Sequence, residues 1–127
     1  MARRKKPDGF DSRFEQEVFE ASDKRKTTYH PEKFKYVVER TYTPDFKIKG
    51  RRGKEIYVET KGYWTGSDRS KHLAVVAQNP DIDLRLVFMN AHNRLNKRSK
   101  TTYAMWCDKH GVKWAEKRIP KEWYNER

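Results

Sequence analysis

Residues 41–64 contain two runs of alternating apolar and polar side chains on either side of a basic turn. Alternation with a period of two is typical of a β-strand with one buried face, and a short turn between two such runs favours a β-hairpin. If residues 51–53 form a three-residue turn, Gly53 takes the left-handed position that such a loop requires. Gly50 then pairs with Lys54, and this pairing fixes the register of the whole hairpin.

Counting outward from this turn places Asp45 directly opposite Glu59, with Cβ atoms about 4.5–5.5 Å apart, a distance at which like charges are destabilising. Lys61 projects from the same face, because strand side chains alternate. A hard divalent cation would relieve the repulsion, and Mg²⁺ commonly uses one or two carboxylates together with waters and substrate phosphates. The pattern predicts a Mg²⁺ site, at which Mn²⁺ should substitute and Lys61 orients the attacking water. A one-residue slip would send Asp45 to the other face.

Thirty Lys and Arg residues against eighteen Asp and Glu residues give the chain a net charge of +12. Such a surplus in 127 residues indicates a polyanionic partner. No apolar run approaches the length of about 20 residues that spans a bilayer, so nucleic acid is favoured over membrane lipid. The opening MARRKKPDG has no apolar run behind its charges, which predicts a cytoplasmic protein without a signal peptide. The single cysteine, Cys107, excludes an intrachain disulfide and is interpreted as a packing residue.

The remaining pattern predicts a basic arm over residues 1–10 and a single mixed α/β domain over residues 11–127. A helix is expected within 12–22, with Phe14, Val18 and Phe19 forming one buried face. Residues 33–42 alternate and predict a strand that leads into the hairpin.

Further along, residues 66–68 are a helix-start signal, and the helix is expected to end at Asn79-Pro80. The nearly continuous apolar run 84–89 predicts a buried central strand. A short helix stopped by Gly111 follows. The expected architecture is a mixed central β-sheet flanked by helices.

Pro44-Asp45, followed by Glu59-Thr60-Lys61 on the next strand, matches the core of the PD-(D/E)xK nucleases. That pattern alone is common in charged sequences. A longer series of motifs is more specific. The chain resembles the phage endonuclease I family of Holliday-junction resolvases in six motifs that occur in this order: TYTPDF, YVETKG, DRSKHL, DIDLRLVF, CDKHGVKWAEK and IPKEW. The resemblance covers roughly Phe10 to Trp123.

This resemblance implies a restriction-endonuclease-like PD-(D/E)xK fold and Mg²⁺-dependent hydrolysis of phosphodiester bonds in branched DNA, leaving 5′-phosphate and 3′-hydroxyl ends. It implies a phage or mobile-element protein that acts in a bacterial host. It also implies that an acidic residue of the first helix, here Glu15, completes the metal site and that the Thr60 carbonyl is a ligand. Ser12-x-x-Glu15 is equally a capping box, in which Glu15 only ties back to the helix start. The expected catalytic residues are Glu15, Asp45, Glu59 and Lys61, and the expected metal ligands are Asp45, Glu59, Thr60 and Glu15.

Three groups of polar and basic residues are candidate DNA contacts. A helix start favours phosphate, because its free N–H groups point at an anion, and a basic arm or loop adds charge. Solvated surface charge is the alternative for each group. The candidates are Arg3, Arg4, Lys5 and Lys6 in the arm, Ser67, Arg69, Lys71 and His72 at the helix start, and Arg94, Lys97 and Arg98 in the loop.

Family resemblance further implies an intertwined homodimer in which the first helix and strand are exchanged between subunits. Here the connector before TYTPDF is shorter and lacks the prolines of that bridge, so a monomer remains the alternative. A monomer would more naturally nick one strand, as a sequence- or mismatch-directed nicking endonuclease with the same active site. A non-catalytic nucleic-acid-binding protein is the third reading, but it gains nothing from opposing Asp45 and Glu59.

Overall fold

The computed structural model describes residues 9–127 and divides them into two compact units, the first ending at Glu39 and the second running from Arg40 to Arg127. The expected boundary between arm and domain falls near the undescribed residues and stays a prediction. In these 119 residues no helix has both the length and the apolar character needed to cross a bilayer. The elements are α1 (Arg13–Ala21), β1 (Phe46–Lys49), a 3₁₀ turn (Arg51–Gly53), β2 (Glu55–Lys61), α2 (Gly66–Gln78), β3 (Leu84–Phe88), α3 (Tyr103–Lys109), β4 (Trp114–Glu116) and α4 (Lys121–Tyr124).

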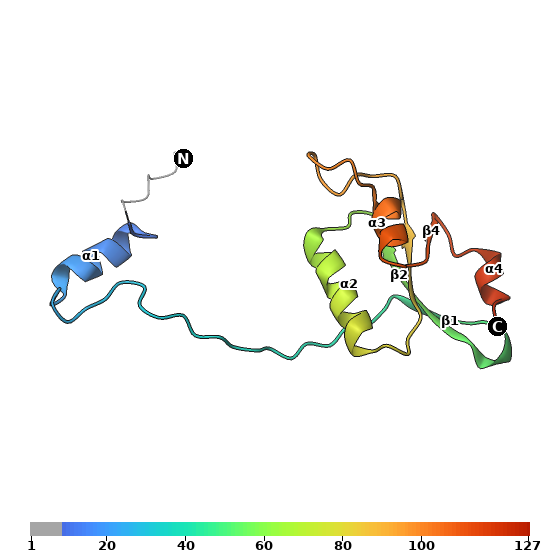
Figure 1. Ribbon diagram of the computed structural model, residues 1–127, viewed down its shortest axis with the longest axis horizontal. Coiled ribbons are helices and arrows are strands. Elements are labelled where there is room, and N and C mark those ends of the chain that lie inside the picture. The colour runs from blue at the N-terminus through green and yellow to red at the C-terminus, as the bar shows by residue number, and fades with distance from the viewer. Residues whose placement is uncertain (1–8) are drawn as a thin grey trace. The chain divides into compact units, whose positions relative to one another are not determined.

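The second unit is built on a four-stranded sheet of order β1-β2-β3-β4. β1 pairs with β2 antiparallel, whereas β2–β3 and β3–β4 are parallel. The parallel pairs require crossovers, which α2 and α3 supply. Both helices lie over one face of the sheet, and α4 lies at the other (Figure 1). The predicted mixed sheet flanked by helices is confirmed.

The hairpin has the register that the sequence predicts. Phe46 pairs with Val58, so that the next position outward places Asp45 opposite Glu59. The Gly50 N–H donates to the Lys54 carbonyl at 2.8 Å, which closes the turn. Gly53 adopts φ +78°, a left-handed conformation that a glycine reaches without steric cost.

Two apolar clusters cover the two faces of the sheet. Leu86 and Phe88 of β3 face the larger cluster, which includes Trp64 and buries Cys107 completely. Burial raises the pKa of the Cys107 thiol to about 12, as expected of a cysteine that packs in the core. Val87 points to the opposite face, into a second cluster of Ile48, Ile56, Val58, Val87 and Trp123.

Arg85 interrupts the apolar run of β3 and is fully buried. Its guanidinium donates to both carboxylate oxygens of Asp83, at 2.8 Å each, and to both of Glu126. The Trp123 ring lies 5.0 Å from the guanidinium carbon. This bidentate pairing attaches the C-terminal segment to the sheet, and the Glu126 carbonyl also accepts from Arg51 N–H in the hairpin turn.

Arg85→Met is expected to lower the free energy of unfolding by about 3 kcal/mol, because it leaves the partly buried carboxylates of Asp83 and Glu126 without the cation that donates to them. Hydrogen bonding to Arg85 lowers the pKa of Asp83 and lowers that of Glu126 to about 2. Carboxylates with depressed folded-state pKa values stabilise the fold above their unfolded pKa of about 4, and this stabilisation is lost as pH falls towards 2. Urea titrations of wild type should therefore show a steeper loss of stability below about pH 4.5 than the variant.

Lys113→Ala is the matched control, because Lys113 also contacts Glu126, at 3.6 Å, but has a side chain 63% exposed. Its removal is expected to cost no more than about 0.5 kcal/mol. Equal losses for the two variants would contradict the assigned role of Arg85.

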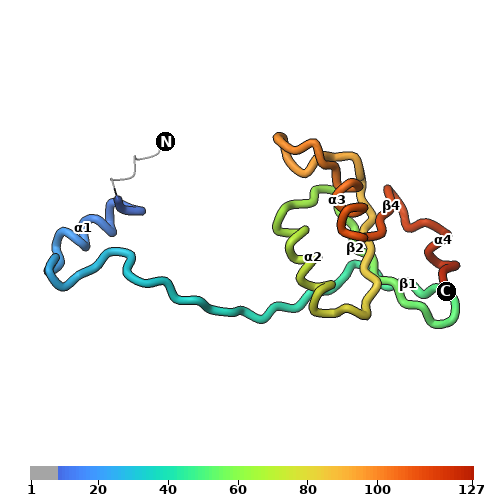
Figure 2. Tube along the Cα trace, viewed as in Figure 1, coloured from blue at the N-terminus to red at the C-terminus, as the bar shows by residue number. Residues whose placement is uncertain are grey.

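The first unit departs from two expectations. α1 forms, but none of its residues is buried: Phe14 is 72% exposed and Val18 is 54% exposed, so the predicted buried face is wrong for a single chain. The predicted strand at 33–42 is also wrong, because these residues form an extended trace that pairs with no described strand (Figure 2). Alternating apolar and polar residues indicate a strand only where a neighbour covers the apolar side chains. A strand is also stable only when a second strand accepts and donates its backbone hydrogen bonds. In residues 9–39 no strand is present to pair with this segment, and Phe10 and Tyr29 pack near Phe19 without burying any residue of α1.

Candidate functional site

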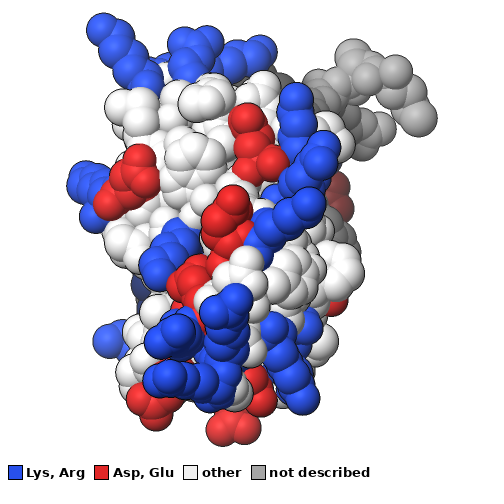
Figure 3. Space-filling model, turned by 90° about the vertical axis from the view of Figure 1, so that its right-hand side faces the viewer, with Lys and Arg blue, Asp and Glu red and all other residues white. Residues whose placement is uncertain are grey.

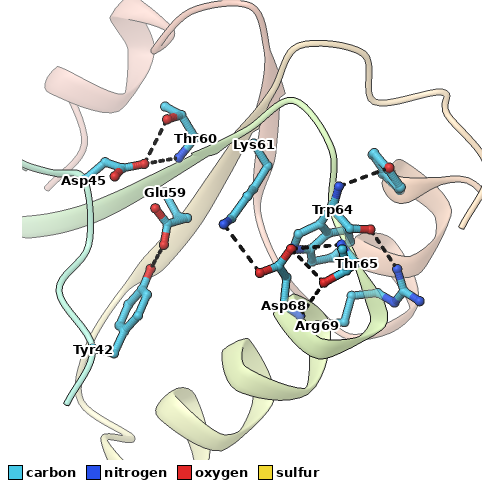
Figure 4. Close-up of polar contacts among 10 residues, drawn as sticks. Tyr42, Asp45, Glu59, Thr60, Lys61, Trp64, Thr65, Asp68 and Arg69 are labelled. Carbon is cyan, nitrogen blue, oxygen red and sulfur yellow. Dashed lines mark hydrogen bonds and ion pairs between the residues drawn. The ribbon is translucent and has the colours of Figure 1, made fainter. Parts of the chain in front are cut away.

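Glu59 and Lys61 lie on β2 and project from the sheet face that α2 covers (Figure 4). Asp45 belongs to the segment that leads into β1. Its Oδ2 accepts hydrogen bonds from the Thr60 N–H at 2.9 Å and from the Thr60 hydroxyl at 2.8 Å. Asp45 is thereby held at the edge of β2, beside Glu59, and is exposed to solvent. The two carboxylates are adjacent, as the hairpin register requires.

Tyr42 holds the second carboxylate of this pair. Its hydroxyl donates to Glu59 Oε2, and burial together with that bond raises the pKa of Tyr42 above its ordinary value. Tyr42 stands three residues before Asp45, so one short segment positions both acidic groups. A metal ligand that is itself hydrogen-bonded keeps its orientation, which is the usual role of such outer partners.

Burial of Glu59 and the proximity of the two acids shift their pKa values in opposite directions. Burial raises the pKa of Glu59, and the neighbouring Asp45 carboxyl raises it further. Hydrogen bonding with Glu59 lowers the pKa of Asp45, and the two donors of Thr60 lower it too. This division is what two like charges show when they share one site. A divalent cation favours the ionised form of both.

The charge of Lys61 lowers the pKa of both Asp45 and Glu59. Its ammonium lies 3.5 Å from Asp68 Oδ1, at the start of α2. The chemistry of these donors fits a hard divalent cation: oxygen ligands from Asp45 and Glu59, one exposed to solvent and one half-buried. Waters and a phosphate oxygen could complete its coordination.

Glu15 lies in the first unit, at the start of α1. Ser12 Oγ accepts from the Glu15 N–H at 3.1 Å, which is half of the capping box. Glu15 Oε2 accepts from Ser12 Oγ and from the Tyr29 hydroxyl, each at 3.2 Å, rather than from the backbone N–H of Ser12. Its carboxylate also lies within 4.8 Å of ligand atoms of Asp11 and His30. Its role in a metal site stays a prediction.

The candidate DNA contacts differ in their exposure. Ser67 and Lys71 are exposed at the start of α2, but His72 is buried and does not reach the surface. Arg69 is partly buried and donates to the Trp64 carbonyl at 3.1 Å. Arg94, Lys97 and Arg98 are all exposed in the loop between β3 and α3.

Basic side chains are spread over the face shown in Figure 3, from its top, towards that loop, to its lower part, towards the β1–β2 turn. Acidic side chains are interspersed among them in the middle and at the bottom of this face. The basic arm residues Arg3, Arg4, Lys5 and Lys6 lie outside the described part of the chain. Their contacts with DNA stay predictions.

Two residues at this site are absent from the sequence-based candidates. Tyr42 carries no nuclease signature, and only the fold shows that its hydroxyl reaches Glu59. The position of Asp68 near Lys61 could have been predicted from the sequence. Thr65-x-x-Asp68 has the capping-box spacing and follows β2 by a few residues, so the helix start had to lie near the end of the strand that carries Lys61.

The comparisons with known proteins agree with the family resemblance of the sequence motifs. The family described as "Phage endonuclease I" matches residues 1–127. The chain is 44% identical over 104 residues to "Endonuclease I" of Escherichia phage T7, covering 80% of this chain and 67% of the relative. It is 47% identical over 79 residues to "Endodeoxyribonuclease 1" of Enterobacteria phage T3, covering 62% of this chain and about half (49%) of that relative. On these matches, the chain is a member of the phage endonuclease I family.

Proposed function

We propose that the protein is a Mg²⁺-dependent DNA endonuclease that cuts branched DNA. The observation that carries the proposal is the adjacent pair Asp45 and Glu59, with Lys61 on the same face of β2. Its relatives are named as an endonuclease and an endodeoxyribonuclease. A protein that only binds nucleic acid would be weakened by this pair, since carboxylates repel phosphate unless a cation intervenes.

The residues divide the chemistry between them. Asp45 and Glu59 would hold the metal, and the Thr60 carbonyl and Glu15 are proposed as further ligands. Bound Mg²⁺ supplies a water of lowered pKa and stabilises the negative charge that develops on the phosphodiester. Lys61 orients the attacking water and offsets the same charge as a fixed cation. The oxygen that leaves remains on the 3′ side as a hydroxyl, and the phosphate stays on the 5′ end.

The surface charge supports DNA as the substrate. Lysines and arginines exceed acidic residues by twelve in the whole chain. The exposed loop between β3 and α3 and the start of α2 are proposed to contact phosphates of two DNA arms. Phosphate contacts position a duplex without reading its bases, which fits recognition of shape over sequence.

The working form is proposed to be a homodimer that exchanges its first unit. Support comes from apolar side chains that one chain leaves uncovered: Phe14 and Val18 on α1, and Tyr36 and Val37, which are 85% and 93% exposed. Exposed large apolar side chains in such number are typical of an interaction site. A second copy of the chain would supply both the cover for α1 and the partner for the extended residues 33–42. Two active sites in one dimer would give paired cuts across a junction.

Incubation with a supercoiled plasmid that extrudes a cruciform, and with a relaxed linear control, tests the proposal directly. With Mg²⁺, paired cuts across the cruciform and little cutting of the linear DNA are expected, and EDTA should abolish both. Single nicks on both substrates would instead indicate a nicking endonuclease. Steeply salt-dependent binding without Mg²⁺-dependent cleavage would leave only a binding protein.

A further inference from the structure

The Asp68 carboxylate uses its two oxygens for two separate contacts. Oδ2 accepts from the backbone N–H and from the hydroxyl of Thr65, at 2.9 Å each, which completes the capping box of α2. Oδ1 lies 3.5 Å from Lys61 Nζ (Figure 4). Helix capping therefore uses only half of this side chain.

We propose that Asp68 is a positioning residue for Lys61: the first turn of α2 holds the ammonium in place beside Glu59. The proposal deepens the proposed endonuclease function and rests on it, because Lys61 matters only if it serves the attacking water. Asp68 would then have two roles: it caps α2, as its capping-box spacing indicates, and it positions Lys61.

A lysine needs such a partner more than an arginine would. Its ammonium is a point charge on a flexible four-carbon stem, so nothing in the side chain itself fixes its place. Asp68 is fixed, because its carboxylate is tied to the backbone at Thr65. The Lys61 and Asp68 side chains are only 29% and 23% exposed, so water screens their attraction less than on an open surface.

The surroundings limit where else the ammonium can go. Lys61 and Asp68 line a cavity of about 30 Å³ between β2 and α2, together with Tyr42, Glu59, Trp64 and His72. Trp64 is almost fully buried, at 1% exposure, and forms a rigid wall. Among the described residues, His72 Nε2 is a buried side-chain atom without a hydrogen-bond partner. A cavity of this size holds about one water, which could link His72 to the charged pair.

Asp68→Asn and Thr65→Ala separate positioning from capping. Asparagine keeps an oxygen for the cap but removes the charge that attracts Lys61. Alanine at 65 removes the hydroxyl contacts of the cap and leaves the Lys61–Asp68 pair, so it is the matched control. Thr65→Ala is expected to lower the melting temperature modestly, because a lost cap costs about 1 kcal/mol, a loss of roughly fivefold in the folding equilibrium, and Asp68→Asn should lower it less.

The single-turnover cleavage rate with Mg²⁺ distinguishes the two variants. Asp68→Asn should cut about 10- to 100-fold more slowly, since a displaced catalytic group costs about that much. Its affinity for junction DNA in Ca²⁺ should stay within about twofold of wild type, because phosphate contacts set that affinity. Thr65→Ala should cut at nearly the wild-type rate. Equal rates for Asp68→Asn and wild type, or equal slowing in both variants, would overturn the proposal.

A measurement without DNA tests the contact between Asp68 and Lys61 independently of the proposed endonuclease activity. The Lys61 ammonium, observed by ¹⁵N NMR in metal-free protein, should show slowed proton exchange that Asp68→Asn abolishes and Thr65→Ala retains. If wild type fails to cleave but this difference holds, the endonuclease proposal fails and the positioning contact stands. If the difference is absent, Asp68 does not hold Lys61.

Discussion

Asp45→Asn should reduce Mg²⁺-dependent cleavage by about 1,000-fold or more, because a metal ligand is lost and with it the stabilisation of developing charge. The fold should survive the change, since the asparagine oxygen can still accept from the Thr60 N–H. Affinity for junction DNA in EDTA should be unchanged or higher, because one negative charge beside the scissile phosphate has gone. Cleavage rates, Mn²⁺ binding and DNA binding measured on the same preparation check these three statements.

Glu55→Gln is the control for charge alone. Glu55 lies on the same strand as Glu59, and its exposed carboxylate contacts Lys47 at 3.9 Å, away from the site. Its neutralisation should leave cleavage within about twofold, as expected for a surface ion pair. If Asp45→Asn cut as fast as Glu55→Gln, the metal site would have to lie elsewhere.

The hairpin was predictable because its information is local. A three-residue turn with glycine at its third position determines the pairing of Gly50 with Lys54, and the alternation on both arms agrees with that register. The face that carries Glu59 and Lys61 then follows from the pleat alone. Nothing beyond residues 41–64 was needed to bring the two carboxylates together.

The parts that failed depend on partners distant in sequence or absent from the chain. Residues 33–42 alternate like a strand, yet alternation does not say which chain supplies the neighbouring strand. Arg85 sits in the most apolar strand because Glu126, 41 residues later, pairs with it. His72 looked like a phosphate contact at a helix start, but its place four residues after Asp68 turns it inward, towards Trp106.

Mixing two inactive variants decides which subunit supplies Glu15. Glu15→Gln and Asp45→Asn should each be inactive alone. Co-refolded together, they should regain cleavage if the first unit is exchanged, because one site of each mixed dimer then combines an intact Glu15 with an intact Asp45. Random pairing makes half of the dimers mixed, each with one intact site of two, so about a quarter of the wild-type sites should be active.

The product of that mixture is as informative as its rate. A mixed dimer with one intact site should nick a cruciform without making the paired cut. Asp45→Asn mixed with Glu59→Gln is the control, because both changes fall in the same unit and no pairing of subunits restores a site. If the first unit is not exchanged, every site of the Glu15→Gln and Asp45→Asn mixture keeps one defect and cleavage stays absent. A rescue seen only in the first mixture would therefore require that Glu15 reaches the hairpin of the other subunit.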